Sequence, residues 1–279
     1  MKSDRVGLRE RSGTGMACRY PIILVHGLMV RHFKRFRAFG KIGRNIESDG
    51  HTVYIATHDG YGSIETNAEQ LRDYISSVLK KTGAEKVHLI AHSKGGLDLK
   101  YMLKTYGMTE RIASFTTLST PHKGSVVASH IWKLPMWIKK IINFFINTFY
   151  RIIGDKHPNA MKACDQLRYS DDTNESLDYL DGIYCQSYSA TMRRGRDSFI
   201  MAIPHRIHKK YGNPDNDGMV SRESAKFGNY RGDMLDISIS HGQMVDFGSR
   251  KHQRQKIYEF YRTMCRELEE IEAAPKVTQ

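Results

Sequence analysis

The sequence predicts an α/β fold, in which a mostly parallel central sheet carries helices on both faces. Three observations predict it. Short apolar runs rich in β-branched residues alternate with amphipathic segments of helical period. These runs are continuous rather than alternating, which is typical of strands buried on both faces. With 279 residues, 40% of them hydrophobic, and no internal repeat, the chain is predicted to form a single domain over residues 1–279.

Five segments have the character of buried strands. They are Tyr20–Val25, Thr52–Ala56, Val87–Ala91, Ile112–Leu118 and Ile183–Tyr188. A later apolar alternation, Leu235–Ile239, predicts one more strand near the C-terminal end. Strands joined through helices connect with right-handed crossovers, so the sheet is expected to be parallel.

The helices between these strands have clear boundaries. Thr66 and Glu69 form a capping-box pattern at the start of one helix, and Gly83 is placed to end it. A second helix is predicted from Ser93 to near Gly107. Apolar residues of helical period from Ile257 to Ile271 predict a terminal amphipathic helix.

An unusually apolar helix is predicted between residues 131 and 153. It carries a narrow polar stripe formed by Lys139, Lys140, Asn143, Asn147 and Arg151. Two interpretations remain open: a helix buried between other elements, or a cap whose apolar face covers a site or meets lipid. The more polar residues up to 182 continue the segment with short helices, so the insertion spans about residues 125–182.

The charge is strongly positive, because 43 Lys and Arg outnumber 30 Asp and Glu and leave +13. Such an excess favours nucleic acid, anionic lipid or acidic substrates, or simply a solvated surface. The densest basic patch, residues 31–37, includes aromatic residues, but Phe33, Phe36 and Phe39 are spaced as one face of a packed helix. No nucleic-acid motif accompanies the patch, and we predict no nucleic-acid partner.

The four cysteines form neither a metal-type pair nor a dense disulfide pattern; they are Cys18, Cys164, Cys185 and Cys265. The first fifteen residues contain no apolar signal region, which together with the cysteines predicts a cytoplasmic location. The longest apolar run, residues 141–150, is about half of what a membrane span needs. We therefore predict no transmembrane segment.

Ser93 is the candidate nucleophile. It lies in the pattern Ala91-x-Ser93-x-Gly95, between a predicted strand and a predicted helix. Small residues two positions away on each side allow the sharp turn of a nucleophile elbow, and the strand–turn–helix context supports that interpretation. The helix N-terminus also directs free N–H groups towards the serine.

A serine hydroxyl needs a base to become nucleophilic, and a histidine base needs an acid to fix its tautomer. His241 follows the Leu235–Ile239 alternation in a turn and is the predicted base. Asp217 is the predicted acid, with Asp215 as its rival, although turn chemistry alone also explains either aspartate. The predicted oxyanion donors are the backbone N–H groups of Leu28 and Lys94.

Glycine at position 27 would let the Leu28 backbone come close to a ligand. His26 and His92 adjoin these two donors, and both are interpreted as structural.

The ordered set of motifs resembles bacterial triacylglycerol lipases and related esterases. The motifs are Pro21–Leu28, Gly62–Ala68, Ala91–Gly96, Ser119–Ser125, Asn216–Val220 and Ser240–Gly242. The resemblance covers about residues 20 to 250 and implies an α/β-hydrolase fold and carboxylic-ester hydrolysis through an acyl-enzyme intermediate. It further implies Ser93, Asp217 and His241 as the catalytic triad, selects Asp217 over Asp215, and favours a lid for the insertion.

The sequence departs from this family at Gln243, where many relatives have a calcium-binding aspartate. A neutral amide is a weaker ligand for a hard cation, so we predict no required metal and no cofactor. The expected partners are an acyl ester or lipid and, transiently, a lipid interface. Two alternatives stay open: a basic lipid- or membrane-binding protein that does not use its hydrolase scaffold, and an acyltransferase or thioesterase that uses the same triad.

Overall fold

The computed structural model describes residues 17–28, 38–152, 154–170 and 176–273. Within them, a six-stranded sheet in the order β2-β1-β3-β4-β5-β6 forms the centre, and every pairing is parallel. The strands are β1 Ile22–Val25, β2 Val53–Ile55, β3 Val87–His92, β4 Ile112–Leu118, β5 Tyr184–Ser189 and β6 Asn229–Asp233. The predicted α/β architecture is therefore confirmed.

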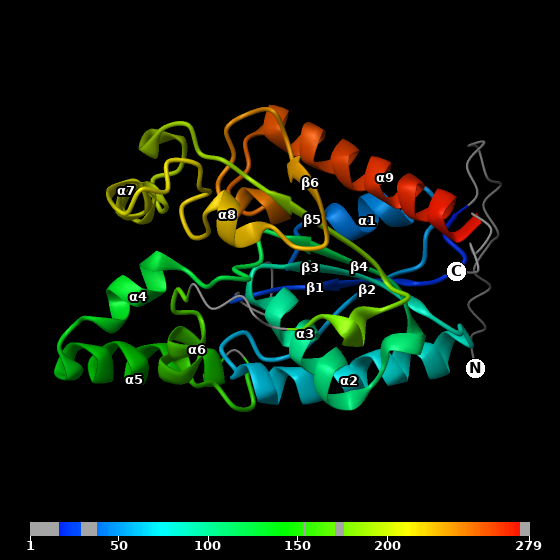
Figure 1. The fold of residues 1–279 in the computed structure, drawn as a ribbon, viewed down its shortest axis with the longest axis horizontal. Coiled ribbons are helices and arrows are strands. Elements are labelled where there is room, and N and C mark those ends of the chain that lie inside the picture. The colour runs from blue at the N-terminus through cyan, green and yellow to red at the C-terminus, as the bar shows by residue number, and fades with distance from the viewer. Residues whose placement is uncertain (1–16, 29–37, 153, 171–175, 274–279) are drawn as a thin grey trace, which may run out of the picture.

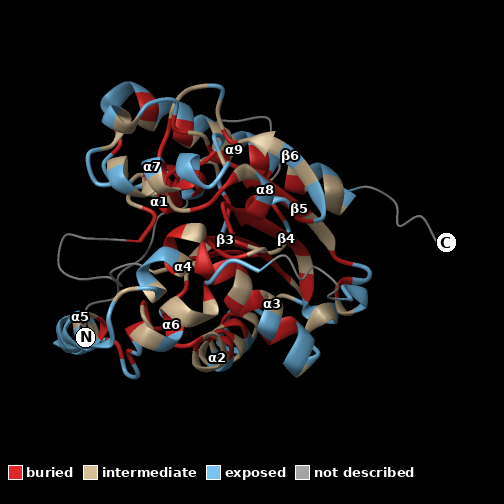
Figure 2. Ribbon diagram, turned by 60° about the vertical axis from the view of Figure 1, so that its left-hand side comes forward, coloured by how far each residue is buried: buried red, intermediate tan, exposed pale blue. Residues whose placement is uncertain are grey.

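Two layers of helices enclose the sheet (Figure 1). α1 (Ile42–Glu47) and α9 (Lys251–Ala273) pack on one face, and α2 (Ile64–Thr82) and α3 (Lys94–Tyr106) on the other. Alternate β1 side chains supply the two cores, Ile22 and Leu24 on the α9 side and Ile23 and Val25 on the α2 side. Figure 2 shows the central strands β3 and β4 buried between the helices.

The sequence placed the start of α2 three residues too late. Ser63, not Thr66, is the N-cap, and its hydroxyl accepts a hydrogen bond from the Thr66 backbone N–H at 3.3 Å. Thr66 therefore lies in the first turn of the helix. The expected end is confirmed, because Gly83 takes the left-handed conformation at φ 69°.

The expected strand at residues 235–239 is wrong, and the last strand is β6 instead. Leu235, Ile237 and Ile239 contact the core on the α9 side from an irregular segment. Their alternation therefore reflects packing against a helix rather than pairing in the sheet. β6 lies at the sheet edge and has a polar sequence, and such a sequence does not show the apolar pattern that predicts a strand.

The described part of the insertion between β4 and β5 includes the α-helices α4 (Val126–Trp132), α5 (Met136–Ile152) and α6 (Ala160–Gln166). The single helix expected over residues 131–153 is thus broken into two. Pro135 ends the first segment, because it has no N–H to donate, and its carbonyl accepts the first bond of α5 from Lys139. Two further α-helices, α7 (Ala202–Lys210) and α8 (Arg222–Ala225), lie between β5 and β6.

α5 turns Lys139, Asn143 and Asn147 of its polar stripe towards the protein, while most of its large apolar side chains are exposed. Asn143 Oδ1 and Asn147 Oδ1 accept hydrogen bonds from the first backbone N–H groups of α6, at 3.0 and 2.9 Å. Trp137, Phe144 and Phe145 are each about two-thirds exposed (65%, 65% and 66%). The interpretation of a helix buried between other elements is therefore wrong.

Two sequence expectations fall on residues outside the described ranges. They are the basic patch at residues 31–37, with Phe33 and Phe36, and the segment examined for a secretory signal. Phe39 is described and fully buried. No helix in the described part of the chain combines the length and hydropathy needed to cross a bilayer.

Candidate active site

Ser93 occupies the sharp turn between β3 and α3, with φ 57° and ψ −134°. A positive φ is strained for a residue with a side chain, and such strain persists where the surrounding packing enforces it. The turn is close-packed on both sides: a Cβ at position 95 would overlap the His26 carbonyl oxygen, and one at position 96 would overlap Thr120 Oγ1. This explains why small residues follow the serine.

His241 reaches Ser93 from the loop that precedes α9. Its Nε2 lies 2.8 Å from Ser93 Oγ, and its Nδ1 lies 2.7 Å from Asp217 Oδ2. The His241 backbone N–H also donates to the Asp217 carbonyl at 2.9 Å, which ties the two loops together. The structure therefore brings together three side chains that are 124 and 24 residues apart along the chain.

Asp217 is fully buried. Its second oxygen, Oδ1, accepts the backbone N–H groups of Met219 at 2.9 Å and Val220 at 2.8 Å. Burial alone would raise the pKa of this carboxyl, but the charge of His241 and these hydrogen bonds outweigh it and lower the pKa below its usual value. The group therefore stays ionised beside the imidazole.

The rival aspartate has a different role in the structure. Asp215 is half exposed and forms an ion pair with Arg222, at 2.5 Å between Oδ2 and Nη1. Its carboxylate is thus used at the surface, whereas Asp217 faces His241.

The two other histidines near the site bond to backbone rather than to Ser93. His92 Nε2 lies 3.1 Å from the His241 carbonyl oxygen, and burial lowers the His92 pKa well below its usual value, so the ring stays neutral. The His26 ring stacks on His58 at 4.0 Å between ring centroids. Both contacts fit the structural interpretation made from the sequence.

The backbone of residues 27 and 28 lies against the start of α3. A Cβ placed on Gly27 would be 2.6 Å from Ser93 Cβ and 2.9 Å from the Lys94 backbone nitrogen. Leu28 lines the same cavity as Ser93 and His241. The Lys94 side chain points away into the protein, where its Nζ lies 2.5 Å from the buried Asp98 carboxylate.

We expect Gly27→Ala to abolish ester hydrolysis, because the added methyl cannot occupy this space without displacing Ser93 or the Lys94 amide. Gly195→Ala is the matched control, since its Cβ would meet atoms at an ordinary 3.8 Å. The measurement is kcat/KM on a soluble p-nitrophenyl ester, with circular dichroism to monitor folding. A folded, fully active Gly27→Ala enzyme would contradict the tight approach.

A cavity of about 350 Å³ opens beside Ser93 and His241. Much of its lining belongs to the insertion, and Met201, the residue before α7, adds to it. The lining is mainly apolar and includes Ala128, Ile131, Trp132, Ile142 and Ile146. Apolar clefts with a few convergent polar groups are the usual form of small-molecule sites. The lining suits the acyl chain of an ester.

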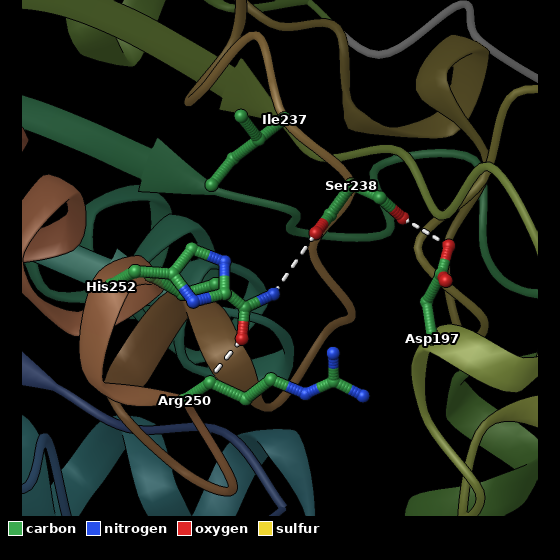
Figure 3. Close-up of a pocket in the computed structure, with 6 residues that line it drawn as sticks. Asp197, Ile237, Ser238, Arg250 and His252 are labelled. Atoms are coloured by element: carbon green, nitrogen blue, oxygen red, sulfur yellow. Dashed lines mark hydrogen bonds between the residues drawn. The ribbon is translucent and has the colours of Figure 1, made fainter.

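A second, smaller pocket of about 190 Å³ lies beside the start of α9 (Figure 3). Its polar groups bond to one another: Asp197 Oδ2 accepts from the Ser238 hydroxyl at 2.5 Å, and Gln253 Nε2 donates to the Ser238 carbonyl at 3.1 Å. The second bond attaches the segment preceding His241 to α9, and the first attaches it to the short turn at Gly195–Asp197. Neither Ser93 nor His241 lines this pocket.

Gln243, the residue that departs from the family pattern, also supports the His241 loop. Its side-chain oxygen accepts the Ser240 backbone N–H at 2.8 Å. The amide therefore takes part in the fold of this loop.

Two groups of potential metal ligands share Cys18 at the other end of the sheet: Cys18, His51 and Glu269, and Cys18, His88 and Glu272. His51 Nδ1 accepts the Cys18 backbone N–H at 3.2 Å, so Nε2 carries the proton and faces Glu269 at 3.3 Å. A metal ligand needs a lone pair at that nitrogen. The first group is therefore arranged as a histidine–carboxylate pair rather than as a metal site.

Comparison with known proteins agrees with this fold. Residues 20–183 match the family model described as alpha/beta hydrolase fold. Triacylglycerol lipases from Pseudarthrobacter phenanthrenivorans and Burkholderia plantarii are each 35% identical over 165 residues, which is 56% of this chain and 51% and 46% of theirs. The chain thus spans about half the length of these curated relatives.

Solved structures show the same fold. A metagenomic carboxyl esterase superposes with a TM-score of 0.70 at 17% identity, over 96% of this chain and 80% of its own. Staphylococcus hyicus lipase superposes with a TM-score of 0.66 at 16% identity, over 96% and 100%. The family match covers more than half of the sequence, and the chain belongs to the α/β-hydrolase fold family.

Proposed function

We propose that this protein is a lipase- or esterase-type serine hydrolase of carboxylic esters. The observation that carries the proposal is the continuous hydrogen-bonded series from Asp217 through His241 to Ser93. The mainly apolar cavity beside it suits an acyl chain, and the lipase relatives and esterase-like folds support the same chemistry.

In the proposed mechanism, Ser93 Oγ attacks the acyl carbonyl while His241 Nε2 takes its proton. The Asp217 carboxylate stabilises the imidazolium that forms. The Leu28 and Lys94 backbone N–H groups donate to the oxyanion. His241 then gives its proton to the leaving alcohol, and the acyl group stays on Ser93. Water, deprotonated by His241, attacks this acyl-enzyme, releases the acid and restores the serine.

A chain-length series of p-nitrophenyl esters, from acetyl to palmitoyl, tests this function. The proposal requires turnover of at least part of the series, and the preferred length distinguishes an esterase from a lipase. No turnover of any member, with salt-sensitive binding to anionic vesicles, would instead favour a lipid-binding protein that does not use its scaffold. Equal turnover of thioesters, or transfer of the acyl group to an added alcohol, would point to the thioesterase or acyltransferase alternatives.

We further propose that α5 and its neighbours form a lid that meets the lipid surface. α5 exposes Trp137, Phe144 and Phe145, while its opposite side, with Ile142 and Ile146, lines the cavity. An apolar helix face of this kind enters a lipid interface, and the net positive charge favours anionic lipid.

The double variant Phe144→Ser/Phe145→Ser tests this contact. We expect activity on emulsified or vesicle-bound esters to fall about tenfold or more, because two aromatic side chains can no longer be buried in the lipid interface. Activity on soluble short-chain esters should stay unchanged. The double variant Tyr101→Ser/Tyr211→Ser, which removes exposed aromatics outside α5, serves as the control. Equal losses on soluble and interfacial substrates would contradict the proposed contact.

A further inference from the structure

Lys139 is a buried cation in an otherwise mainly apolar cavity. It lies on α5 and is 9% exposed. It lines the same cavity as Ser93 and His241. Moving an ammonium group out of water is costly unless a partner compensates its charge.

The contacts of Lys139 compensate that charge incompletely. Its Nζ donates to the Trp132 carbonyl at 2.9 Å and lies 4.5 Å from the centroid of the Trp132 ring. An ammonium group has three donors, and neither contact carries a formal negative charge. Among the described residues, two acidic groups nearby pair with other cations, Glu65 with Lys162 at 3.2 Å and Asp165 with Arg168 at 2.7 Å, and the buried Asp155 accepts the Tyr61 backbone N–H at 2.9 Å.

A second cation lies near the same ring, but the Asp165 carboxylate matches its charge. The Arg168 guanidinium lies 5.3 Å from the centroid of the same Trp132 ring. Lys139 is therefore a cation of the cavity wall without a carboxylate partner among the described residues, while most of the lining is apolar.

We propose that Lys139 recognises a negatively charged group on the substrate, so that the preferred substrate is an amphiphilic ester bearing a phosphate or a carboxylate. This inference rests on the proposed ester hydrolysis and makes its substrate class specific. A neutral triacylglycerol would leave the buried ammonium without an anionic partner, whereas an anionic ester would supply one.

A purely structural role is the competing explanation. Lys139 joins α5 to the last carbonyls of α4, where a cation is favourable. Loss of such a connection would affect neutral and anionic ligands alike. The two roles therefore differ in how the effect depends on ligand charge.

Binding of octyl phosphate, compared with octanol, tests the subsite without any turnover. Trp132 fluorescence reports binding once Trp137, the other tryptophan, is replaced by Phe. In this background we expect Lys139→Met to weaken octyl phosphate binding about tenfold or more and to leave octanol binding unchanged, because a hydrogen bond to a charged group is lost. Lys140→Met is the matched control, since Lys140 neighbours Lys139 but is exposed.

Lys139→Arg, which keeps the charge, should retain most of the preference for octyl phosphate. Equal octyl phosphate affinity in the wild type and Lys139→Met, or an equal loss for both ligands, would overturn the proposal.

Kinetics on two matched pairs of esters identify where the anionic group sits. One pair is p-nitrophenyl hexanoate and the p-nitrophenyl half-ester of adipic acid, which differ by a carboxylate at the acyl end. The other is monooleoylglycerol and its 3-phosphate, which differ by a phosphate on the alcohol. We expect Lys139→Met to lower kcat/KM about tenfold or more for the anionic member of at least one pair, mainly through KM, and to spare the neutral members.

The outcomes separate this inference from the function on which it rests. If Lys139→Met kept the charge preference of the wild type in both pairs and still hydrolysed neutral esters, the anion subsite would be refuted and the hydrolase proposal would stand. A wild type that hydrolyses none of the four esters would refute the hydrolase proposal, and the octyl phosphate measurement would still decide whether Lys139 binds anions.

Discussion

Ser93→Ala is expected to reduce ester hydrolysis to background, a loss of about a million-fold in kcat in enzymes of this mechanism. The alanine removes the oxygen that lies 2.8 Å from His241 Nε2. Because no other group of the proposed mechanism can form the acyl-enzyme, the remaining donors and the cavity would still bind the ester without turning it over. The measurement is kcat on p-nitrophenyl butyrate, with Ser77→Ala, an exposed serine on α2, as the control.

The same position allows a stability measurement. Ser93 is held at φ 57°, which costs about 1–3 kcal/mol for a residue with a side chain. Glycine adopts that conformation without strain, so Ser93→Gly should unfold at a higher temperature than Ser93→Ala while being equally inactive. Retained activity in either variant would show that another nucleophile does the chemistry.

Asp217→Asn is expected to lower kcat about ten-thousand-fold, the loss seen when the acid of a serine triad becomes an amide. The amide cannot stabilise the imidazolium, and its N–H₂ group would favour the wrong tautomer of His241. Since hydrogen bonds from Met219 and Val220 reach the other oxygen, the local fold should survive.

Asp215→Asn is the matched control, because it removes a carboxylate two residues away that pairs with Arg222 at the surface. It should leave kcat within about twofold, as expected for an exposed ion pair. If Asp215→Asn proved the more damaging variant, the assignment of the acid would be reversed.

Much of the fold and the candidate site could be predicted because the relevant signals are local. The strand–turn–helix at Ser93 follows from an apolar run, small residues and a helical period within about twenty positions. The ends of α2 and α3 at Gly83 and Gly107 follow from the left-handed conformation that glycine tolerates. Asp217 is different, because its turn chemistry equals that of Asp215 and the family resemblance was needed to choose it.

Other features depend on tertiary contacts that periodicity does not record. The alternation at residues 235–239 records contact with the core on the α9 side and was misread as strand pairing. The apolar period of α5 does not say which face turns inward. Asn143 and Asn147 satisfy backbone groups of α6, so this part of the polar stripe faces the protein. The sequence shows Lys139 only as part of a narrow polar stripe, and its place in the cavity emerges from the orientation of α5.

Covalent trapping tests the central claim most directly. An alkyl fluorophosphonate reacts with a serine whose hydroxyl is activated by a neighbouring histidine, and mass spectrometry of the digested protein locates the adduct. The account predicts one adduct, on the peptide containing Ser93, which disappears in Ser93→Ala and forms much more slowly in Asp217→Asn. A labelled serine elsewhere, or intact Ser93 after prolonged exposure of the folded protein, would contradict it.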